Sequence, residues 1–240
     1  MKPNVKTSGI DGCKAGWIAV SLDRSRASYK LLRTSQDLNG WLHEQDCTFI
    51  DVPIGLSEDQ PVRMCDFLLR RVLGPGYSSS VFGPPVRSAF LVNDYKAACD
   101  INEAKTGKRF SKQAWNIMPK IRQVDDILQE NTSLIPKVHE SHPELLFKKL
   151  NRGGEPLPKK KTKEGIERRF DLLRRADNRI EDLFTEIRGA FLKGEVKDDD
   201  ILDALILAIM AAQTPYRPIR TLPIPPETDG KGLSMAIHFI

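Results

Sequence analysis

Short apolar runs separated by turn residues fill the first fifty positions of the chain. Three of them favour short strands joined in a meander: residues 5–10, 16–22 and 28–33. Residues 35–44 suit a short amphipathic helix, and the apolar run 47–52, which Pro53 ends, predicts a fourth strand. Because a helix separates this strand from the meander, it should lie parallel to an earlier strand.

Helical patterns replace strand patterns over the next eighty or so residues, until a short apolar run at 135–139 predicts a fifth strand. Helices are expected at 58–73, 93–105 and 111–130, and Pro119 should kink or divide the last of them. A connection of this length usually carries structure of its own. We therefore predict a single domain over residues 1–240, with a helical insertion, residues 53–134, between its fourth and fifth strands.

Helical periodicity continues in the C-terminal part of the chain. It predicts one long helix from about Thr162 to Leu192 and a last helix from Asp198 to Ala212 that is almost wholly apolar. A Pro-rich segment (215–226) and a strand-like run (233–240) follow. Strands alternating with helices indicate an α/β protein.

The composition is that of an ordinary globular protein, with 40% hydrophobic and 29% charged residues. The four cysteines are widely spaced without a Cys-x-x-Cys pair, which is typical of reduced thiols rather than a zinc site. The first residues lack the apolar run of a secretory leader, and the longest apolar stretch, 201–212, is too short to span a bilayer. We expect a soluble, cytoplasmic protein with no membrane partner.

Basic residues concentrate in one segment, although the net charge of the whole chain is only +5. Residues 148–175 hold eleven Lys or Arg against four Asp or Glu. A segment of this kind can follow a phosphate backbone. It can equally be a solvated helical surface, so it favours a nucleic-acid partner without requiring one.

Acidic residues end three of the predicted strands: Asp11 the first, Asp51 the fourth and Glu140 the fifth. Asp200 and Asp203 stand at the head of the apolar helix, three positions apart and therefore on one face. Because the neighbours of Asp203 are apolar, its charge would be costly to bury without a partner. Of the five acids, Asp203 is therefore the strongest candidate for a functional role.

A sheet in the order 3-2-1-4-5, with strands one, four and five parallel, would place the strand-end acids about 4.8 Å apart. Ligands of open α/β sheets bind outside the carboxyl ends of such strands. Crowded carboxylates raise one another's pKa values unless a cation neutralises them. Mg²⁺ takes oxygen ligands, and two such ions can activate a water and stabilise the leaving oxygen of a phosphodiester. The pattern favours metal-assisted phosphoryl chemistry with Mg²⁺ or Mn²⁺.

Most of these acids also have a purely structural explanation. Asp11 precedes a glycine as in hairpin turns, and Asp51 precedes Val-Pro as in other turns. Glu140 could simply be exposed to solvent. Asp200 follows two further aspartates at a helix N-terminus, where negative charge is favourable in itself.

Eight stretches of the chain resemble a known family: residues 10–17, 49–56, 63–66, 80–82, 111–121, 139–145, 160–165 and 199–205. Among them are Ile-Asp-Gly-Cys-Lys-Ala-Gly-Trp, Phe-Ile-Asp-Val-Pro-Ile-Gly-Leu and Asp-Asp-Ile-Leu-Asp-Ala-Leu. Together they resemble a domain-of-unknown-function family described as predicted nucleases with a ribonuclease H-like fold. The resemblance spans nearly the whole chain and implies a mixed five-stranded sheet in the order 3-2-1-4-5.

The last stretch also resembles Holliday-junction resolvases of the same superfold, in which Asp-x-x-Asp-Ala-Leu closes the metal site. By that resemblance the metal ligands would be Asp11, Asp51, Asp200 and Asp203, and Glu140 would be an additional acid. Several basic or polar residues could form a substrate pocket over the metals: Lys14, Arg63, Arg87, Ser111, Lys120, Lys160 and Lys161. Those in the insertion could equally form ion pairs that pin helices in place.

The favoured function is a divalent-metal-dependent phosphodiester hydrolase, a nuclease, in which Asp11, Asp51 and Asp203 bind the metal. Asp200 or Glu140 would complete a second ion site. One alternative is an ATP-dependent phosphotransferase like the actin-like ATPases and sugar kinases, which share this superfold but usually need two such halves. Another is a non-catalytic nucleic-acid-binding module whose acids are structural.

Overall fold

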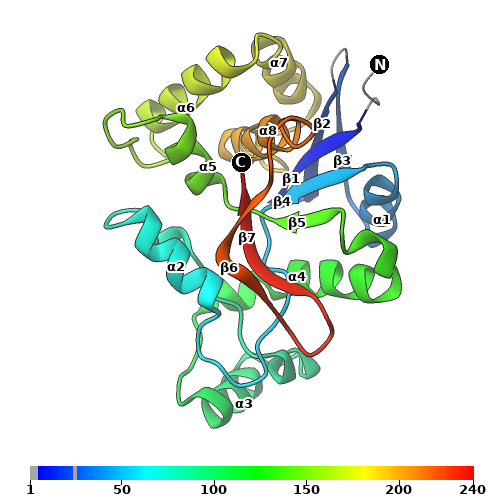
Figure 1. Ribbon diagram of the computed structural model, residues 1–240, viewed down its shortest axis with the longest axis vertical. Coiled ribbons are helices and arrows are strands. Elements are labelled where there is room, and N and C mark those ends of the chain that lie inside the picture. Colours follow the sequence, from blue (N-terminus) through cyan, green and yellow to red (C-terminus); the bar gives the residue numbers. More distant parts are fainter. Residues whose placement is uncertain (1–4, 24–25) are drawn as a thin grey trace. The chain divides into compact units, whose positions relative to one another are not determined.

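The computed structural model describes residues 5–23 and 26–240. The chain divides into two compact units. One contains the residues up to Asp51, Pro136–Arg220 and Phe239–Ile240; the other contains Val52–Ile135 and Thr221–His238. Figure 1 labels the elements of both, and each unit is described in turn.

The first unit is built on a five-stranded mixed sheet. Its strands are β1 (Thr7–Cys13), β2 (Gly16–Leu22), β3 (Ala27–Leu32), β4 (Cys47–Ile50) and β5 (Val138–Glu140). They lie in the order β3-β2-β1-β4-β5, with β1 antiparallel to β2 and parallel to β4, and β4 parallel to β5. The predicted α/β fold and strand order are therefore confirmed.

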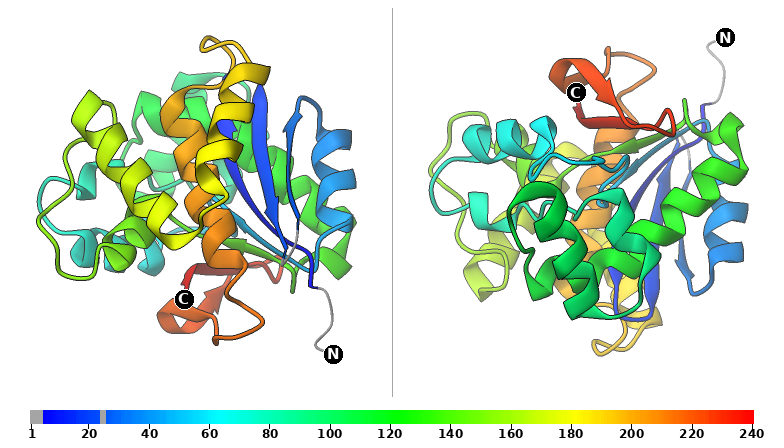
Figure 2. Two further views of the ribbon diagram at one scale, coloured as in Figure 1. Left: turned by 90° about the horizontal axis from the view of Figure 1, so that it is seen from above. Right: turned by 90° about the horizontal axis from the view of Figure 1, so that it is seen from below.

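Among the described residues, the helices of the first unit are α1 (Ser35–His43), α5 (Pro143–Leu150), α6 (Lys163–Ala176), α7 (Ile180–Ala190) and α8 (Asp198–Ala211). The sheet lies between α8 on one face and α1 on the other (Figure 2). Every residue of α8 from Ile201 to Ala211 is buried, because the sheet covers one side of the helix while α5, α6 and α7 cover others. The predicted apolar helix is thus the centre of this unit's core.

One long helix from Thr162 to Leu192 was the wrong expectation, because α6 and α7 are separate. Asp177 interrupts the helix in extended conformation, and its carboxylate accepts hydrogen bonds from the backbone N–H and the guanidinium of Arg179. The same guanidinium donates to the carbonyl of Asp23 at 2.8 Å, beside the β2–β3 connection. This long-range hydrogen bond of Arg179 stabilises the interruption between α6 and α7. The helical periodicity of the sequence does not reveal such a contact.

The second unit is mainly helical and contains the insertion between β4 and β5. Its helices are α2 (Met64–Leu73), α3 (Tyr95–Thr106), α4 (Lys112–Glu130) and the 3₁₀ turns Ser78–Ser80, Arg87–Leu91 and Thr132–Leu134. Most of a two-stranded sheet, β6 (Arg220–Thr228) with β7 (Ser234–Phe239), also belongs to it. Residues 220–226 of the Pro-rich segment therefore run as a strand. Across the described residues, none of the helices has the length and apolar character needed to cross a membrane.

Two local expectations for the insertion differ from the structure. The helix predicted from residue 58 begins only at Met64, because the hydroxyl of Ser57 accepts the N–H groups of Asp59 and Gln60 and holds that stretch as a turn. Pro119 does not divide its helix, since α4 runs as one element from Lys112 to Glu130, and a kink there stays a prediction.

Candidate metal centre

Three carboxylates from distant parts of the chain converge at one edge of the first unit's sheet. Asp11 lies in β1, Asp51 directly follows β4, and Asp203 lies in α8. Each contributes one oxygen to a group in which all three atoms lie within 4.8 Å of one another. The structure thus brings together three of the four predicted metal ligands.

Strand register explains why Asp11 and Asp51 lie side by side. In the parallel pairing of β1 with β4, Ile10 is the partner of Ile50, so the next residue of each strand is the aspartate. The backbone N–H of Asp51 donates to the carbonyl of Ile10 at 3.0 Å, which continues the ladder past the end of β4. Both side chains therefore leave the sheet at its carboxyl edge.

A glycine in β1 allows α8 to bring in the third acid. A Cβ atom placed on Gly9 would lie 2.1 Å from the backbone nitrogen of Ala208 and 2.4 Å from the carbonyl oxygen of Ala204. Such distances are far below van der Waals contact, so only glycine lets the helix backbone rest directly on the strand. Asp203 is one residue before Ala204, so this close approach of α8 to β1 determines where Asp203 lies relative to the ends of the strands.

Burial and mutual repulsion raise the pKa values of these carboxyl groups. Burial raises the pKa of Asp11 well above its usual value, and the charges of Asp203 and Asp51 add to the effect. Burial raises the pKa of Asp203 to about 7, although the ammonium of Lys160 opposes the shift. Burial also raises the pKa of Asp51, against the opposing charges of His142 and Lys160. The three acids cannot all be ionised near neutral pH without more positive charge.

The donor set fits a hard divalent cation. All three groups offer oxygen, which Mg²⁺ and Mn²⁺ prefer. One oxygen of Asp203, Oδ1, is buried and has no hydrogen-bond partner in the part of the chain that the structure describes. A buried carboxylate oxygen without a donor costs free energy unless a ligand satisfies it. Ligands of an octahedral Mg²⁺ lie roughly 2.9 Å apart when adjacent and roughly 4.1 Å apart when opposite, so the three oxygens would move closer together on binding one ion.

Lys160 is the basic residue in contact with this group. Its Nζ lies 2.6 Å from Oδ2 of Asp203, an ion pair across 43 residues of sequence. The sequence placed Lys160 among the substrate-binding candidates, whereas the structure places its ammonium on a predicted metal ligand. Its neighbour Lys161 is exposed, as is Lys14 in the turn between β1 and β2.

The two remaining acidic candidates lie outside the group of three. Asp200 stands in the first turn of α8, where its carboxylate accepts the backbone N–H of Lys197 at 2.8 Å. Burial raises its pKa as well. Glu140 is buried at the end of β5, as the register partner of Ile50. A catalytic role for either stays a prediction.

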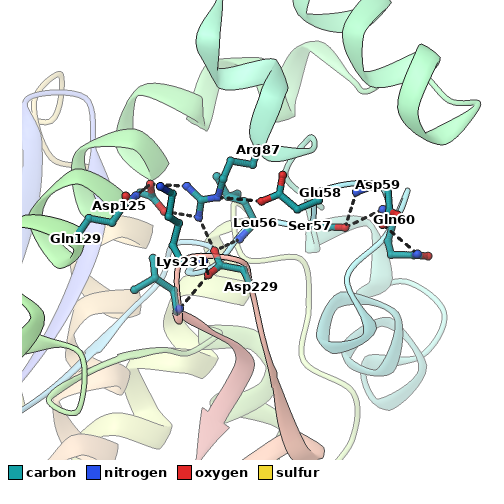
Figure 3. A network of polar contacts seen from close by, with 11 residues as sticks. Leu56, Ser57, Glu58, Asp59, Gln60, Arg87, Asp125, Gln129, Asp229 and Lys231 are labelled. Carbon is teal, nitrogen blue, oxygen red and sulfur yellow. Dashed lines mark hydrogen bonds and ion pairs between the residues drawn. The ribbon is translucent and has the colours of Figure 1, made fainter.

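The candidates in the insertion have internal partners in the second unit. Arg63 is buried, makes a two-pronged ion pair with Asp66, and donates to the carbonyl of Ile54. Arg87 pairs with Asp125 and Asp229 (Figure 3). These contacts match the alternative in which such residues pin structure together.

The other two candidates of the insertion lie on α4. Ser111 caps the start of the helix, since its hydroxyl accepts the N–H of Ala114 at 3.2 Å. Lys120 is half-buried in the same helix. A substrate-binding role for these residues stays a prediction.

One buried pair close to the centre has no signal in the sequence. The guanidinium of Arg169 in α6 donates twice to the carboxylate of Glu144 in α5, at 2.9 and 2.8 Å. Both side chains are buried. Asp51 and Asp203 feel the charge of Glu144, which is among the causes that raise their pKa values. Pairing over 25 positions between two helices leaves no local pattern from which to predict it.

The family comparison covers the entire candidate centre. A family model described as "Protein of unknown function (DUF429)" matches residues 9–228, a range that includes all three converging acids and Lys160. No curated protein and no solved structure matches the chain.

Proposed function

We propose that this chain, which belongs to the DUF429 family, is a divalent-metal-dependent phosphodiester hydrolase, and more specifically a nuclease. The observation that carries the proposal is the group formed by Asp11, Asp51 and Asp203, whose oxygens lie within 4.8 Å of one another. Such a concentration of buried carboxylates destabilises the fold unless it serves to hold a cation.

Asp11, Asp51 and Asp203 would hold Mg²⁺ or Mn²⁺. When bound, such an ion supplies Lewis-acid stabilisation for charge that develops on a phosphoryl group. Asp200 and Glu140 are the two further carboxylates of this unit that a second ion would use. The backbone at β1 and β4 is fixed by the sheet, and α8 is fixed by its buried faces, so the three acids are pre-organised.

Basic side chains of α6 and the preceding loop would bind the phosphate backbone of the substrate. Lys159, Lys161, Lys163, Arg168 and Arg175 are exposed. They belong to the same unit as the acids and to the same segment as Lys160, whose ammonium contacts Asp203. Exposed cations of this kind bind nucleic acid through its phosphates, with little dependence on base sequence.

The sheet topology gives no support to the phosphotransferase alternative. Proteins of the actin-like and sugar-kinase type usually hold nucleotide between two halves of this fold. Within residues 5–23 and 26–240, one sheet has the order 3-2-1-4-5 and the other has only two strands. A hydrolase that works at one sheet edge needs a single such half.

Cleavage assays on a substrate panel test the proposal. Single- and double-stranded DNA, RNA, a four-way junction and a simple aryl phosphodiester would each be incubated with Mg²⁺ or Mn²⁺. We expect hydrolysis of at least one substrate, loss of it in Asp11→Asn, and retention of it in Asp182→Asn, a matched change at an exposed acid of α7. Full activity in Asp11→Asn, or activity that survives chelation of divalent ions, would contradict the proposal.

A further inference from the structure

Lys160 brings a protein cation to the carboxylate that a metal would need. Its Nζ lies 2.6 Å from Asp203 Oδ2, and the side chain of Asp203 is only 2% exposed. In the part of the chain that the structure describes, no other ion pair reaches the three converging carboxylates. The ammonium therefore provides positive charge directly at Asp203, one of the three acids.

The backbone around Lys160 is anchored, so this contact is built into the fold. Arg169, itself buried by its pair with Glu144, donates to the carbonyl of Pro158 at 2.8 Å. Thr162 donates through both its N–H and its hydroxyl to the carbonyl of Lys159, at 2.9 and 2.8 Å. Fixed backbone on both sides of Lys160 directs its side chain toward Asp203.

Gly165 in α6 allows the backbone on either side of Lys160 to pack closely against this helix. A Cβ atom on Gly165 would lie 2.0 Å from the carbonyl oxygen of Lys159, so the loop can rest on the helix only at a glycine. Gly165 also donates its N–H to the hydroxyl of Thr162 at 3.0 Å. The position of the loop is therefore specified by several independent contacts.

The side chain of Lys160 is free to leave without disturbing this anchor. It is 33% exposed, and lysine is a point charge on a flexible four-carbon stem. Its neighbours Lys159 and Lys161 are exposed. Rotation about side-chain bonds would carry the ammonium from Asp203 to solvent while Pro158, Lys159 and Thr162 keep their backbone contacts.

We propose that Lys160 is an internal counter-ion that competes with the divalent cation for Asp203 and is displaced when the cation binds. The inference rests on the proposed function, because it concerns the same three carboxylates. A divalent ion and an ammonium on one buried carboxylate repel each other strongly. Metal binding therefore breaks the Lys160–Asp203 contact. Because coupling between two equilibria is reciprocal, the contact lowers the affinity for the metal by the same factor by which the bound metal disfavours the contact.

Calorimetric titration with Mn²⁺ alone tests the competition. We expect the Kd of Lys160→Met to be roughly 10- to 100-fold lower than that of the wild type, the range typical of coupled sites. Lys96→Met removes a charge whose side chain is 84% exposed and pairs with Asp100 in the second unit, so its Kd should match the wild type. A Kd for Lys160→Met equal to or higher than the wild-type value would overturn the inference.

Chemical labelling of the wild-type chain provides a second measurement that needs no variant. An amine-acylating reagent, followed by mass spectrometry of peptides, would report the reactivity of each lysine with and without Mn²⁺. We expect acylation of Lys160 to increase on addition of Mn²⁺, while acylation of Lys96, which is exposed in α3, stays constant. Unchanged labelling of Lys160 under conditions where calorimetry shows Mn²⁺ bound would also overturn the inference.

The two proposals fail in different ways. If the wild-type chain binds no Mn²⁺ in the titration, the metal-dependent function and the competition are both wrong. If it binds Mn²⁺ without any change in the labelling of Lys160, only the competition is wrong. If Lys160 is displaced by Mn²⁺ but no phosphodiester is cleaved, the competition holds and the hydrolase proposal fails.

Discussion

Two clusters of acidic side chains in this protein differ in how their charge is balanced. In the first unit, Asp11, Asp51 and Asp203 converge, and the ammonium of Lys160 contacts Asp203. In the second unit, Arg87 lies between Asp125 and Asp229 (Figure 3). Both clusters place carboxylates in the interior, where uncompensated charge is costly.

In the cluster around Arg87, the buried carboxylate of Asp229 accepts hydrogen bonds from several donors. Asp229, whose side chain is fully buried, accepts the N–H groups of Leu56, Lys231 and Leu233, each at 2.9 Å, in addition to the guanidinium. Burial raises the pKa of Asp229, but these hydrogen bonds outweigh burial and hold the pKa below its usual value.

In the described part of the chain, Asp203 accepts a hydrogen bond from Lys160 while its Oδ1 has no donor, and burial raises the pKa of Asp203 to about 7. The comparison teaches that burial of carboxylates does not by itself indicate a ligand site. The supply of hydrogen-bond donors distinguishes the two groups, because Asp229 accepts backbone N–H groups as well as the guanidinium, whereas Asp203 keeps one buried oxygen without a partner among the described residues.

The largest expected effect on stability comes from removing the central cation of the second cluster. Arg87→Met leaves Asp125 and Asp229 without their guanidinium, and breaking a buried ion pair typically lowers the free energy of unfolding by about 3–5 kcal/mol. Denaturant unfolding measures the change. Arg109→Met, which breaks exposed pairs with Asp100 and Glu103, is the matched control and should have only a small effect. Equal losses in the two variants would show that the Arg87 cluster is not a structural core.

The next effect concerns how the first cluster is assembled. Gly9→Ala forces β1 and α8 apart, because the added Cβ would meet the backbone at Ala208. We expect a loss of about 1–3 kcal/mol in the free energy of unfolding, together with weaker Mn²⁺ binding. Gly189→Ala in α7 meets no atom within 4 Å and should stabilise the chain slightly. Unchanged Mn²⁺ affinity in Gly9→Ala would mean that the close packing of α8 against β1 does not position Asp203.

The two clusters should also differ, by a smaller amount, in how their contributions to folding stability change with pH: the two contributions change in opposite directions. The pKa of Asp203 rises from 3.8 to about 7 on folding, so its contribution favours the folded state at low pH and is lost between about pH 4 and pH 7. The pKa of Asp229 falls on folding, so its contribution is present above pH 4 and is lost as the pH decreases.

Thermal melts in a chelating buffer from about pH 3 to pH 8 measure both slopes. Relative to the wild type, Asp203→Asn should gain stability as the pH rises from about 4 to 7, whereas Asp229→Asn should lose stability as the pH rises toward 4. Parallel melting curves for the wild type and Asp203→Asn would contradict the raised pKa of Asp203.

Much of the first cluster could be predicted from the sequence, because its geometry follows from regular structure. Apolar runs ending in Asp11 and Asp51 imply two parallel strands, and parallel register then places the acids together. Asp203 is recognisable as an acid inside an apolar helix. These inferences depend on periodicities of two and 3.6 residues, which the sequence displays directly.

The parts that sequence reasoning missed depend on contacts between distant, irregular segments. The ion pair of Lys160 with Asp203 requires the path of a loop that Arg169 and Thr162 hold in place. The break between α6 and α7 depends on a guanidinium that reaches another part of the chain. Such contacts have no repeat along the sequence, so only the folded structure shows them.

Anomalous diffraction from crystals soaked in Mn²⁺ tests the central claim most directly, because it locates the ion and its ligands together. The account predicts Mn²⁺ coordinated by Asp11, Asp51 and Asp203, with no ion at Asp125 or Asp229. A fully soaked crystal without Mn²⁺ at the three acids, or with Mn²⁺ at the Arg87 cluster instead, would contradict it.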